Sequence, residues 1–307
     1  MGQVHDLLGV RGKLEALKAA EFDRREIEAA AAYMSDEDSG IGFLYSGWCQ
    51  AALPHKRLPD NKGWQIKTDR VTLIVEPGMR PGLGEEPEHI GVPFGSRARL
   101  IMLYLQSEAL RTRSREVELG KSLRGWLLRM GISVGGKSVD AVREQAERIS
   151  RCRLSFHLLS GKSAGMIQQN ILDKAFFLQD ADDRQGTLFL ETAKLSEAFF
   201  EQLQRHPVPV EEAAIRAVNN NSMALDLYAW LAYRLHSLPS ARPISWKALN
   251  GQFGQGFGKI GNFKVKFLMN LKLALAVYPD AKVDVDERGL ILHPSRPPVA
   301  PKVKVIG

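Results

Sequence analysis

An α+β fold with two tandem winged helix-turn-helix domains, preceded by an N-terminal helical and β-rich extension, is predicted by three observations. The order helix, strand, helix, turn, helix, β-hairpin occurs twice, with the two turns about 120 residues apart. In each copy, the helix after the turn lies in a basic stretch of sequence. The length of 307 residues is also ample for two domains.

The composition indicates a globular chain and excludes several classes of protein. Hydrophobic residues make up 44% and charged residues 25%, so both domains are expected to bury cores. Cys49 and Cys152 form no CxxC pair, and the seven histidines include no HExxH or HxH pattern. The charged N-terminus does not resemble a secretory signal, and no stretch approaches ~18 apolar residues. We expect a cytoplasmic protein with no membrane span, catalytic residue, cofactor or metal.

The N-terminal extension has two parts. Residues 1–40 form an N-terminal helical segment, with one or two amphipathic helices over 5–32 and an acidic break from Ser35 to Gly40. Residues 41–90 are rich in strands and turns, with short β-type runs at 64–67 and 71–75. The expected first domain, 41–206, includes this β-rich part.

The first module follows within that domain. Ser96 is a candidate cap for a buried helix over 97–110, and 115–119 is a short strand. The next two helices are indicated by apolar residues at helical spacing on either side of a turn at 131–136. These stripes are Leu123, Trp126, Leu127 and Met130, then Val139, Val142, Ala146 and Ile149. A hairpin is expected from 153–159 through a tip at 160–163, with further strands in 166–179 and 187–191.

The second module is expected over residues 207–295, after a break at His206-Pro207-Val208-Pro209. A helix over 223–238 begins after Ser222, a short extended piece covers 243–245, and a short helix covers 246–253. A glycine-rich turn at 254–258 precedes a long helix with the stripe Phe263, Phe267, Leu271 and Leu275. The segments 282–285 and 290–292 form a hairpin, and 296–307 is expected to be a flexible tail.

Positive charge is concentrated in two islands. Residues 97–153 carry 13 Lys/Arg and 6 Asp/Glu, a net of +7, and residues 242–272 carry 6 Lys/Arg and no acid, a net of +6. The whole chain has a net charge of +7, so the remainder sums to 7 − 7 − 6 = −6. Basic islands in an acidic body favour a polyanionic partner such as DNA, with merely solvated faces as the alternative.

Helical geometry selects the candidate DNA-contacting residues. In each second helix they lie away from the apolar stripe or on its flanks, where lysine and arginine can reach phosphates or guanine, and asparagine and glutamine can reach adenine. Lys264 projects nearer the stripe, and Lys162 lies at the expected hairpin tip. For each residue taken singly, a solvated surface position is the alternative. The candidates are Lys137, Ser138, Arg143, Gln145, Arg148, Lys162, Lys259, Asn262, Lys264 and Lys266.

Residues 91–154 resemble the conserved block of the plasmid RepA replication initiator family. The run is GVPFGSRARLIMLYLQSEALRTRSREVELGKSLRGWLLRMGISVGGKSVDAVREQAERISRCRL, and the segments CQAALPHKRLP (49–59) and VTLIVEPG (71–78) are also similar to that family. The resemblance implies binding to directly repeated sequences, called iterons, in double-stranded origin DNA. It also implies recruitment of host replication proteins and autorepression as a homodimer.

Two glycine motifs support an alternative, a nucleotide-binding enzyme. Residues 131–138 match G-x-x-x-x-G-K-[ST], and residues 256–261 match G-x-G-x-x-G. Both motifs require a buried strand directly before them, whereas SLRGWLLRM and SWKALNGQF have helical character. We therefore favour turns of the two DNA-binding modules. A transcriptional repressor of the same fold is the nearer alternative to an initiator.

Overall fold

The computed structural model describes residues 3–300 except for residues 20, 38–39, 69–70, 83, 85, 133–134, 136, 161–162 and 180–187. The fold combines helices with small antiparallel sheets and has two compact units. Residues 43–207 form one, here the central unit, and residues 1–42 with 208–307 form the other, here the terminal unit. The chain passes from one unit to the other within β1 (Ile41–Tyr45) and at the start of β11 (Pro207–Glu211).

The central unit contains five helices and nine strands among its described residues, besides the end of β1. Its helices are α3 (Ser46–Gln50), α4 (Gly95–Thr112), α5 (Gly120–Arg129), α6 (Lys137–Arg151) and α7 (Glu197–Arg205). Its strands are β2 (Trp64–Lys67), β3 (Val71–Glu76), β4 (Gly78–Arg80), β5 (Glu88–Gly91), β6 (Glu116–Glu118), β7 (Arg153–Ser160), β8 (Ser163–Asn170), β9 (Leu172–Gln179) and β10 (Leu188–Leu195).

Helix α4 is the core of the central unit and is buried on almost every side, as its sequence predicts. Its polar residues Gln106 and Ser107 are also buried, and their side-chain oxygens accept hydrogen bonds from the Tyr45 and Phe43 amides. These bonds satisfy groups whose burial would otherwise be costly. Ser96 is not the expected cap, because the helix begins at Gly95 and its N-cap residue is Phe94.

Helices α5 and α6 follow in the predicted order. The stripe of Leu123, Trp126, Leu127 and Met130 is confirmed, because all four side chains are buried. On α6 the prediction is half right: Ala146 and Ile149 are buried, whereas Val139 and Val142 are only partly covered.

Two sheets divide the strands that follow α6. Strands β7 and β8 do form the predicted hairpin, but they extend the sheet β2-β3-β7-β8, with Leu73 opposite Phe156. Strand β6 pairs instead with β10 in the sheet β6-β10-β9, with Glu118 opposite Thr192. The hairpin that completes the sheet with β6 is β9–β10, and the expectation that the strand 153–159 and the tip 160–163 belong to this hairpin is wrong. Strands β4 and β5 form a separate hairpin that contacts α6.

The terminal unit contains the remaining elements, together with the start of β1 and most of β11. Its helices are α1 (Gln3–Ala19), α2 (Arg24–Met34), α8 (Glu212–Ala217), α9 (Ser222–Arg234), the 3-10 turn η1 (Leu235–Ser237), α10 (Trp246–Phe253) and α11 (Ile260–Ala276). Its other strands are β12 (Arg242–Ser245), β13 (Val283–Val285) and β14 (Gly289–Leu292), which form the sheet β12-β14-β13. The predicted hairpin near 282–292 is confirmed as β13–β14.

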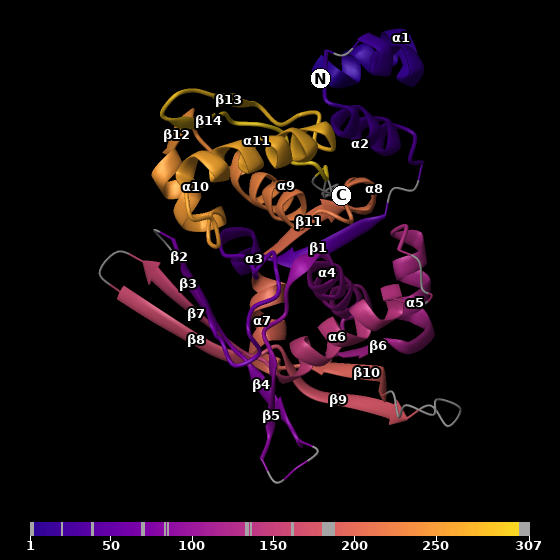
Figure 1. Ribbon diagram of the computed structural model, residues 1–307, viewed down its shortest axis with the longest axis vertical. Coiled ribbons are helices and arrows are strands. Elements are labelled where there is room, and N and C mark those ends of the chain that lie inside the picture. Colours follow the sequence, from indigo (N-terminus) through magenta and orange to yellow (C-terminus); the bar gives the residue numbers. More distant parts are fainter. Residues whose placement is uncertain are drawn as a thin grey trace, which may run out of the picture. The chain divides into compact units, whose positions relative to one another are not determined.

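Helices α10 and α11 follow one another in Figure 1, and aromatic side chains pack between them. Phe263 and Phe267 are fully buried, and the Phe267 ring centroid lies 5.8 Å from that of Trp246 and 5.7 Å from that of Phe253. Burial of each such ring contributes about 1.5–3 kcal/mol to folding. The stripe continues through Leu271 and Ala274, and Leu275 is only partly buried.

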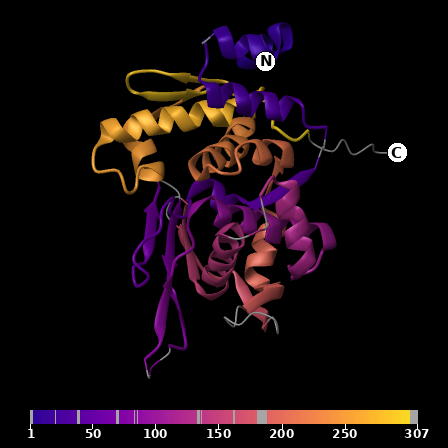
Figure 2. The ribbon, with the colours of Figure 1, turned by 45° about the vertical axis from the view of Figure 1, so that its right-hand side comes forward.

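The two N-terminal helices pack within the terminal unit. Helix α2 contacts α8 and α11, as Figures 1 and 2 both show, and it buries Ile27 and Ala30. In α1, His5 Nε2 lies 2.8 Å from the carbonyl oxygen of Ala276, at the end of α11. The expected tail begins at Arg296, whose carbonyl accepts a hydrogen bond of 2.6 Å from Tyr278 Oη. Residues 301–307 of the tail lie outside the described residues.

Each unit contains the same sequence of elements. In the central unit α4, β6, α5, α6, β9 and β10 follow one another after removal of the β7–β8 insertion, and in the terminal unit the order is α9, β12, α10, α11, β13 and β14. In both, the first strand pairs with the third and the third with the second. The repeated connectivity places α11 and α6 at equivalent positions.

Candidate nucleic-acid interface

Helix α11 presents an exposed basic face. Lys259, Asn262 and Lys266 are all exposed, whereas the stripe of Phe263 and Phe267 is buried, as helical periodicity predicts. The helix contains no Asp or Glu, and Lys259 and Lys266 form no ion pair within the described part of the chain. These cations are consequently available to a polyanion.

Lys264 has a different environment from its neighbours. Its Nζ atom lies 5.0 Å from the centre of the Trp246 ring, and the residue is partly buried. A cation above an indole face is stabilised by the ring quadrupole. The structure therefore agrees with the expectation that Lys264 projects nearer the stripe, and it gives this residue a packing role between α10 and α11.

The far end of α11 is covered by N-terminal helices. His5 contacts the Ala276 carbonyl, and the buried Glu26 of α2 lies close enough to Lys272 to be influenced by its charge. The open part of α11 is consequently its first half, from Lys259 to about Met269. The N-terminal half of a recognition helix is the part that usually meets base edges.

Sequence reasoning missed two exposed apolar residues on the same face. Val265 is 61% exposed and Met269 is 41% exposed. They lie four residues apart and roughly opposite the buried stripe, so their helical spacing was a signal that could have identified them. Isolated apolar residues at a surface are common, but these two adjoin the exposed cations of α11.

Helix α6, the equivalent helix in the central unit, has fewer exposed side chains than α11 has. Lys137 is exposed at its first turn, and Ser138 and Arg143 are partly buried. Arg143 Nη1 lies 3.9 Å from Asp140 Oδ1. The Ser138 hydroxyl is buried and has no hydrogen-bond partner in the described residues, so this candidate DNA contact does not face solvent.

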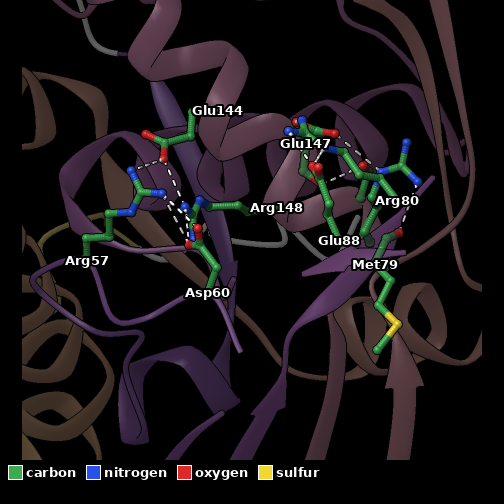
Figure 3. Close-up of polar contacts among 10 residues, drawn as sticks. Arg57, Asp60, Met79, Arg80, Glu88, Glu144, Glu147 and Arg148 are labelled. Carbon is green, nitrogen blue, oxygen red and sulfur yellow. Dashed lines mark hydrogen bonds and ion pairs between the residues drawn. The ribbon is translucent and has the colours of Figure 1, made fainter. Parts of the chain in front are cut away.

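Gln145, expected on a flank of the apolar stripe, and Arg148, expected on the side away from it, are both buried, so the expected exposure of these two residues is wrong. Gln145 is 3% exposed, and its Oε1 accepts the Phe94 amide hydrogen at 2.8 Å. The Arg148 side chain is 4% exposed, and its guanidinium donates to Asp60 and Glu144 (Figure 3). It also donates to the Val92 carbonyl. The physical reason is that the loop before β2 and the hairpin β4–β5 cover this side of α6.

A glycine at the end of β5 allows this strand to approach Arg148 of α6 closely. Gly91 has a φ of 75°, and a Cβ at this position would overlap Arg148 Nη1. Arg57 joins the cluster from the exposed side, with Nη2 2.9 Å from Asp60 Oδ2 and Nη1 3.4 Å from Glu144 Oε1. Burial raises the pKa of the Asp60 carboxyl, but hydrogen bonds from Arg148 and Arg57 outweigh this effect and hold the pKa below its usual value.

A second ionic cluster covers the end of α6 (Figure 3). In strand β4, Arg80 Nε lies 3.3 Å from Glu88 Oε2, and Arg80 Nη1 lies 3.5 Å from Glu147 Oε2. Arg151 Nη1 donates to the Met79 carbonyl at 3.2 Å. The hairpin β4–β5 is thus attached to α6 by charged contacts. Together, the two clusters leave only the first turns of α6 open.

Three further expectations concern the hairpin tip and the two glycine motifs. Lys162 lies outside the described residues. The first glycine motif follows helix α5, and the second follows helix α10, so neither has the preceding strand that a phosphate-binding loop requires. Parts of the first motif, at 133–134 and 136, also lie outside the described residues.

The described part of the chain contains no group of three or more His, Cys, Asp or Glu residues that could hold a metal ion. Cys49 and Cys152 are both buried as free thiols. Among the helices that the structure describes, none combines the length and apolarity that a membrane crossing requires.

Comparison with known proteins identifies one family. Residues 92–248, just over half of the chain, match the family described as plasmid encoded RepA protein. No curated protein sequence matches the chain.

Two solved structures are similar to this chain to different degrees. A crystal structure of selenomethionine derivatives of domains 2 and 3 of RctB has a TM-score of 0.53 at 12% identity, and the match covers 83% of this chain and 99% of that chain. A second crystal structure of RctB domains 2–3 has a TM-score of 0.44 at 11% identity, with coverage of 80% and 94%. The first similarity establishes a shared fold.

Proposed function

The chain belongs to the family of plasmid-encoded RepA proteins, which are replication initiators, and we propose that it binds repeated sequences in duplex origin DNA through helix α11. We further propose that both units are winged helix-turn-helix modules, with α10–α11 and α5–α6 as the two helix pairs. The repeated element order and strand pairing support this assignment, because they are typical of winged helices.

The exposed basic face of α11 is the observation that carries the proposal. Lys259 and Lys266 can neutralise phosphates and release counterions, which provides affinity for any duplex. Asn262, between them in sequence, can donate and accept hydrogen bonds at an adenine edge, which provides sequence preference. A recognition helix requires both properties on one open face.

We propose that the central unit contacts the DNA backbone and does not read the bases. Its helix α6, the equivalent of α11, is closed beyond the first turns by the Arg148 and Arg80 clusters, and the Ser138 hydroxyl is buried. Lys137 and Arg143 are therefore the candidate residues whose side chains remain near the surface. We assign them contacts to the DNA backbone. Recruitment of host replication proteins and homodimer formation remain proposals that rest on the family.

A triple substitution tests the role of α11. Lys259→Ala, Asn262→Ala and Lys266→Ala together should weaken binding to duplex DNA that flanks the gene by at least about tenfold. The loss of two cations should reduce the slope of log K against log salt by about 2. Fluorescence anisotropy across a salt series measures both quantities.

Lys272→Ala is the matched control, since it removes an exposed lysine from the same helix near Glu26 of α2, beyond the first half of α11. It should retain the affinity and the salt slope of the parent chain. Equal binding by the triple variant and the parent would exclude α11 as a DNA reader.

Two alternative functions, a transcriptional repressor and a nucleotide-binding enzyme, can be distinguished from an initiator by experiment. An initiator requires direct repeats of about two helical turns each beside the gene, whereas a repressor of the same fold requires a palindrome, which footprinting distinguishes. We also propose that the chain is not an enzyme. Calorimetric titration with Mg·ATP should give no binding, and binding that Lys137→Ala abolishes would support a nucleotide site instead.

A further inference from the structure

The apolar part of the α11 face is exposed and lies apart from the buried stripe that packs into the terminal unit. Val265 and Met269 are 61% and 41% exposed, while the core contacts of the helix are made by Phe263, Phe267 and Leu271. At 100° per residue, Asn262, Val265 and Met269 fall within about 60° of one another around the helix. Asn262 and the two apolar side chains therefore form one strip, with Lys259 and Lys266 along one side of it.

Duplex DNA fits this strip better than a protein surface does. The major groove offers polar base edges, the apolar 5-methyl group of thymine, and phosphates along its borders. A strip with amide and apolar groups, bordered by lysines, is complementary to that arrangement. A second copy of the same face would oppose lysine to lysine, because α11 contains no acidic residue.

We propose that Val265 and Met269 recognise thymine methyl groups in the major groove, so that the target site contains A·T pairs beneath this face of α11. This inference rests on the proposed function and deepens it by naming the base feature that is read. Burial of one methyl group against an apolar side chain changes affinity by about fourfold.

The experiment uses the full chain and duplexes that it selects from a random-sequence pool. The selected duplex is synthesised again with single thymines replaced by deoxyuridine, which removes only the methyl group. One or two positions should lose about fourfold in affinity. At those positions, Val265→Ser or Met269→Gln should already bind more weakly and should show no further loss with deoxyuridine.

Val285→Ser is the matched control, because Val285 is 50% exposed on β13 of the same unit. This variant should keep the full sensitivity to deoxyuridine. A pool that yields no preferred sequence overturns the proposed function and the inference with it. A selected sequence that is indifferent to every thymine methyl, or that stays sensitive in both apolar variants, overturns the inference alone.

Discussion

Two cations of this chain, Arg148 and Lys266, show how environment separates residues of equal formal charge. The Arg148 side chain is 4% exposed and bonded to Asp60, Glu144 and the Val92 carbonyl. Lys266 is exposed on a helix without acids. Arg148 therefore stabilises the central unit, whereas Lys266 remains available to a ligand.

Arg148→Ala should destabilise the central unit by roughly 2–3 kcal/mol. The value lies below the usual loss for a broken buried pair, because Asp60 and Glu144 are about a third exposed and can be partly hydrated. Urea unfolding measures the change.

Arg57→Ala is the control, since Arg57 contacts the same two carboxylates but is 58% exposed. It should cost less than about 1 kcal/mol. Equal losses of unfolding free energy for the two substitutions would contradict the proposal that the buried ion pairs of Arg148 stabilise the central unit.

At the scale of elements, each candidate recognition helix is defined by what packs against it. Loop 55–60 and hairpin β4–β5 cover the later turns of α6, and α1 and α2 cover only the end of α11. The first half of α11 stays open as a result. Glu26 lies in the contact between α2 and α11, buried, with Oε2 unpartnered among the described residues.

The Glu26 carboxyl should make the terminal unit sensitive to pH. Burial raises the pKa of Glu26, and the nearby Lys272 opposes part of this rise. The folded state then binds the proton more tightly than the unfolded state does. Stability should fall as the pH rises from the ordinary glutamate pKa through the raised value, and should stay lower above it.

Glu26→Gln should remove this decline in urea midpoints measured between pH 4 and pH 8. Glu28→Gln on the same helix is the control. The hydrogen bond from Arg24 lowers the pKa of Glu28, so its contribution has the opposite sign. A Glu26→Gln variant with the parent's pH profile would show that this carboxyl is not coupled to folding.

At the scale of the whole molecule, the terminal unit is discontinuous in sequence, because residues 1–42 group with residues 208–307. Deletion of residues 1–34 removes α1 and α2, including Ile27, whose burial contributes about 1.5–3 kcal/mol by itself. The melting temperature of the terminal unit should fall by at least about 5 °C.

Hydrogen exchange followed by peptide analysis reports on each unit separately. Exchange in the deletion variant should accelerate across α9 to β14 and stay unchanged across α4 to α6. Unchanged protection of α9 to β14 would mean that the N-terminal helices are dispensable for this unit.

Local sequence patterns predicted most helices of the two modules and one of the two hairpins that complete them. The buried stripes of α5 and α11, the buried helix α4 and the hairpin β13–β14 all follow from local periodicity, because each pattern reflects one face turned toward a core. The open candidates Lys259, Asn262 and Lys266 follow from the same rule. Residues 91–154 also carried the family resemblance.

The strands that complete the α4-to-α6 module, and the charges that stay free, follow only from the three-dimensional arrangement of the chain. Strand β6 pairs with β10 instead of the nearer hairpin β7–β8, and this choice depends on contacts between residues far apart in sequence. The basic excess of 97–153 is likewise reduced by acids from outside that island, such as Asp60 and Glu76. A count of charge along the chain cannot include such partners, because ion pairing depends on distance in space.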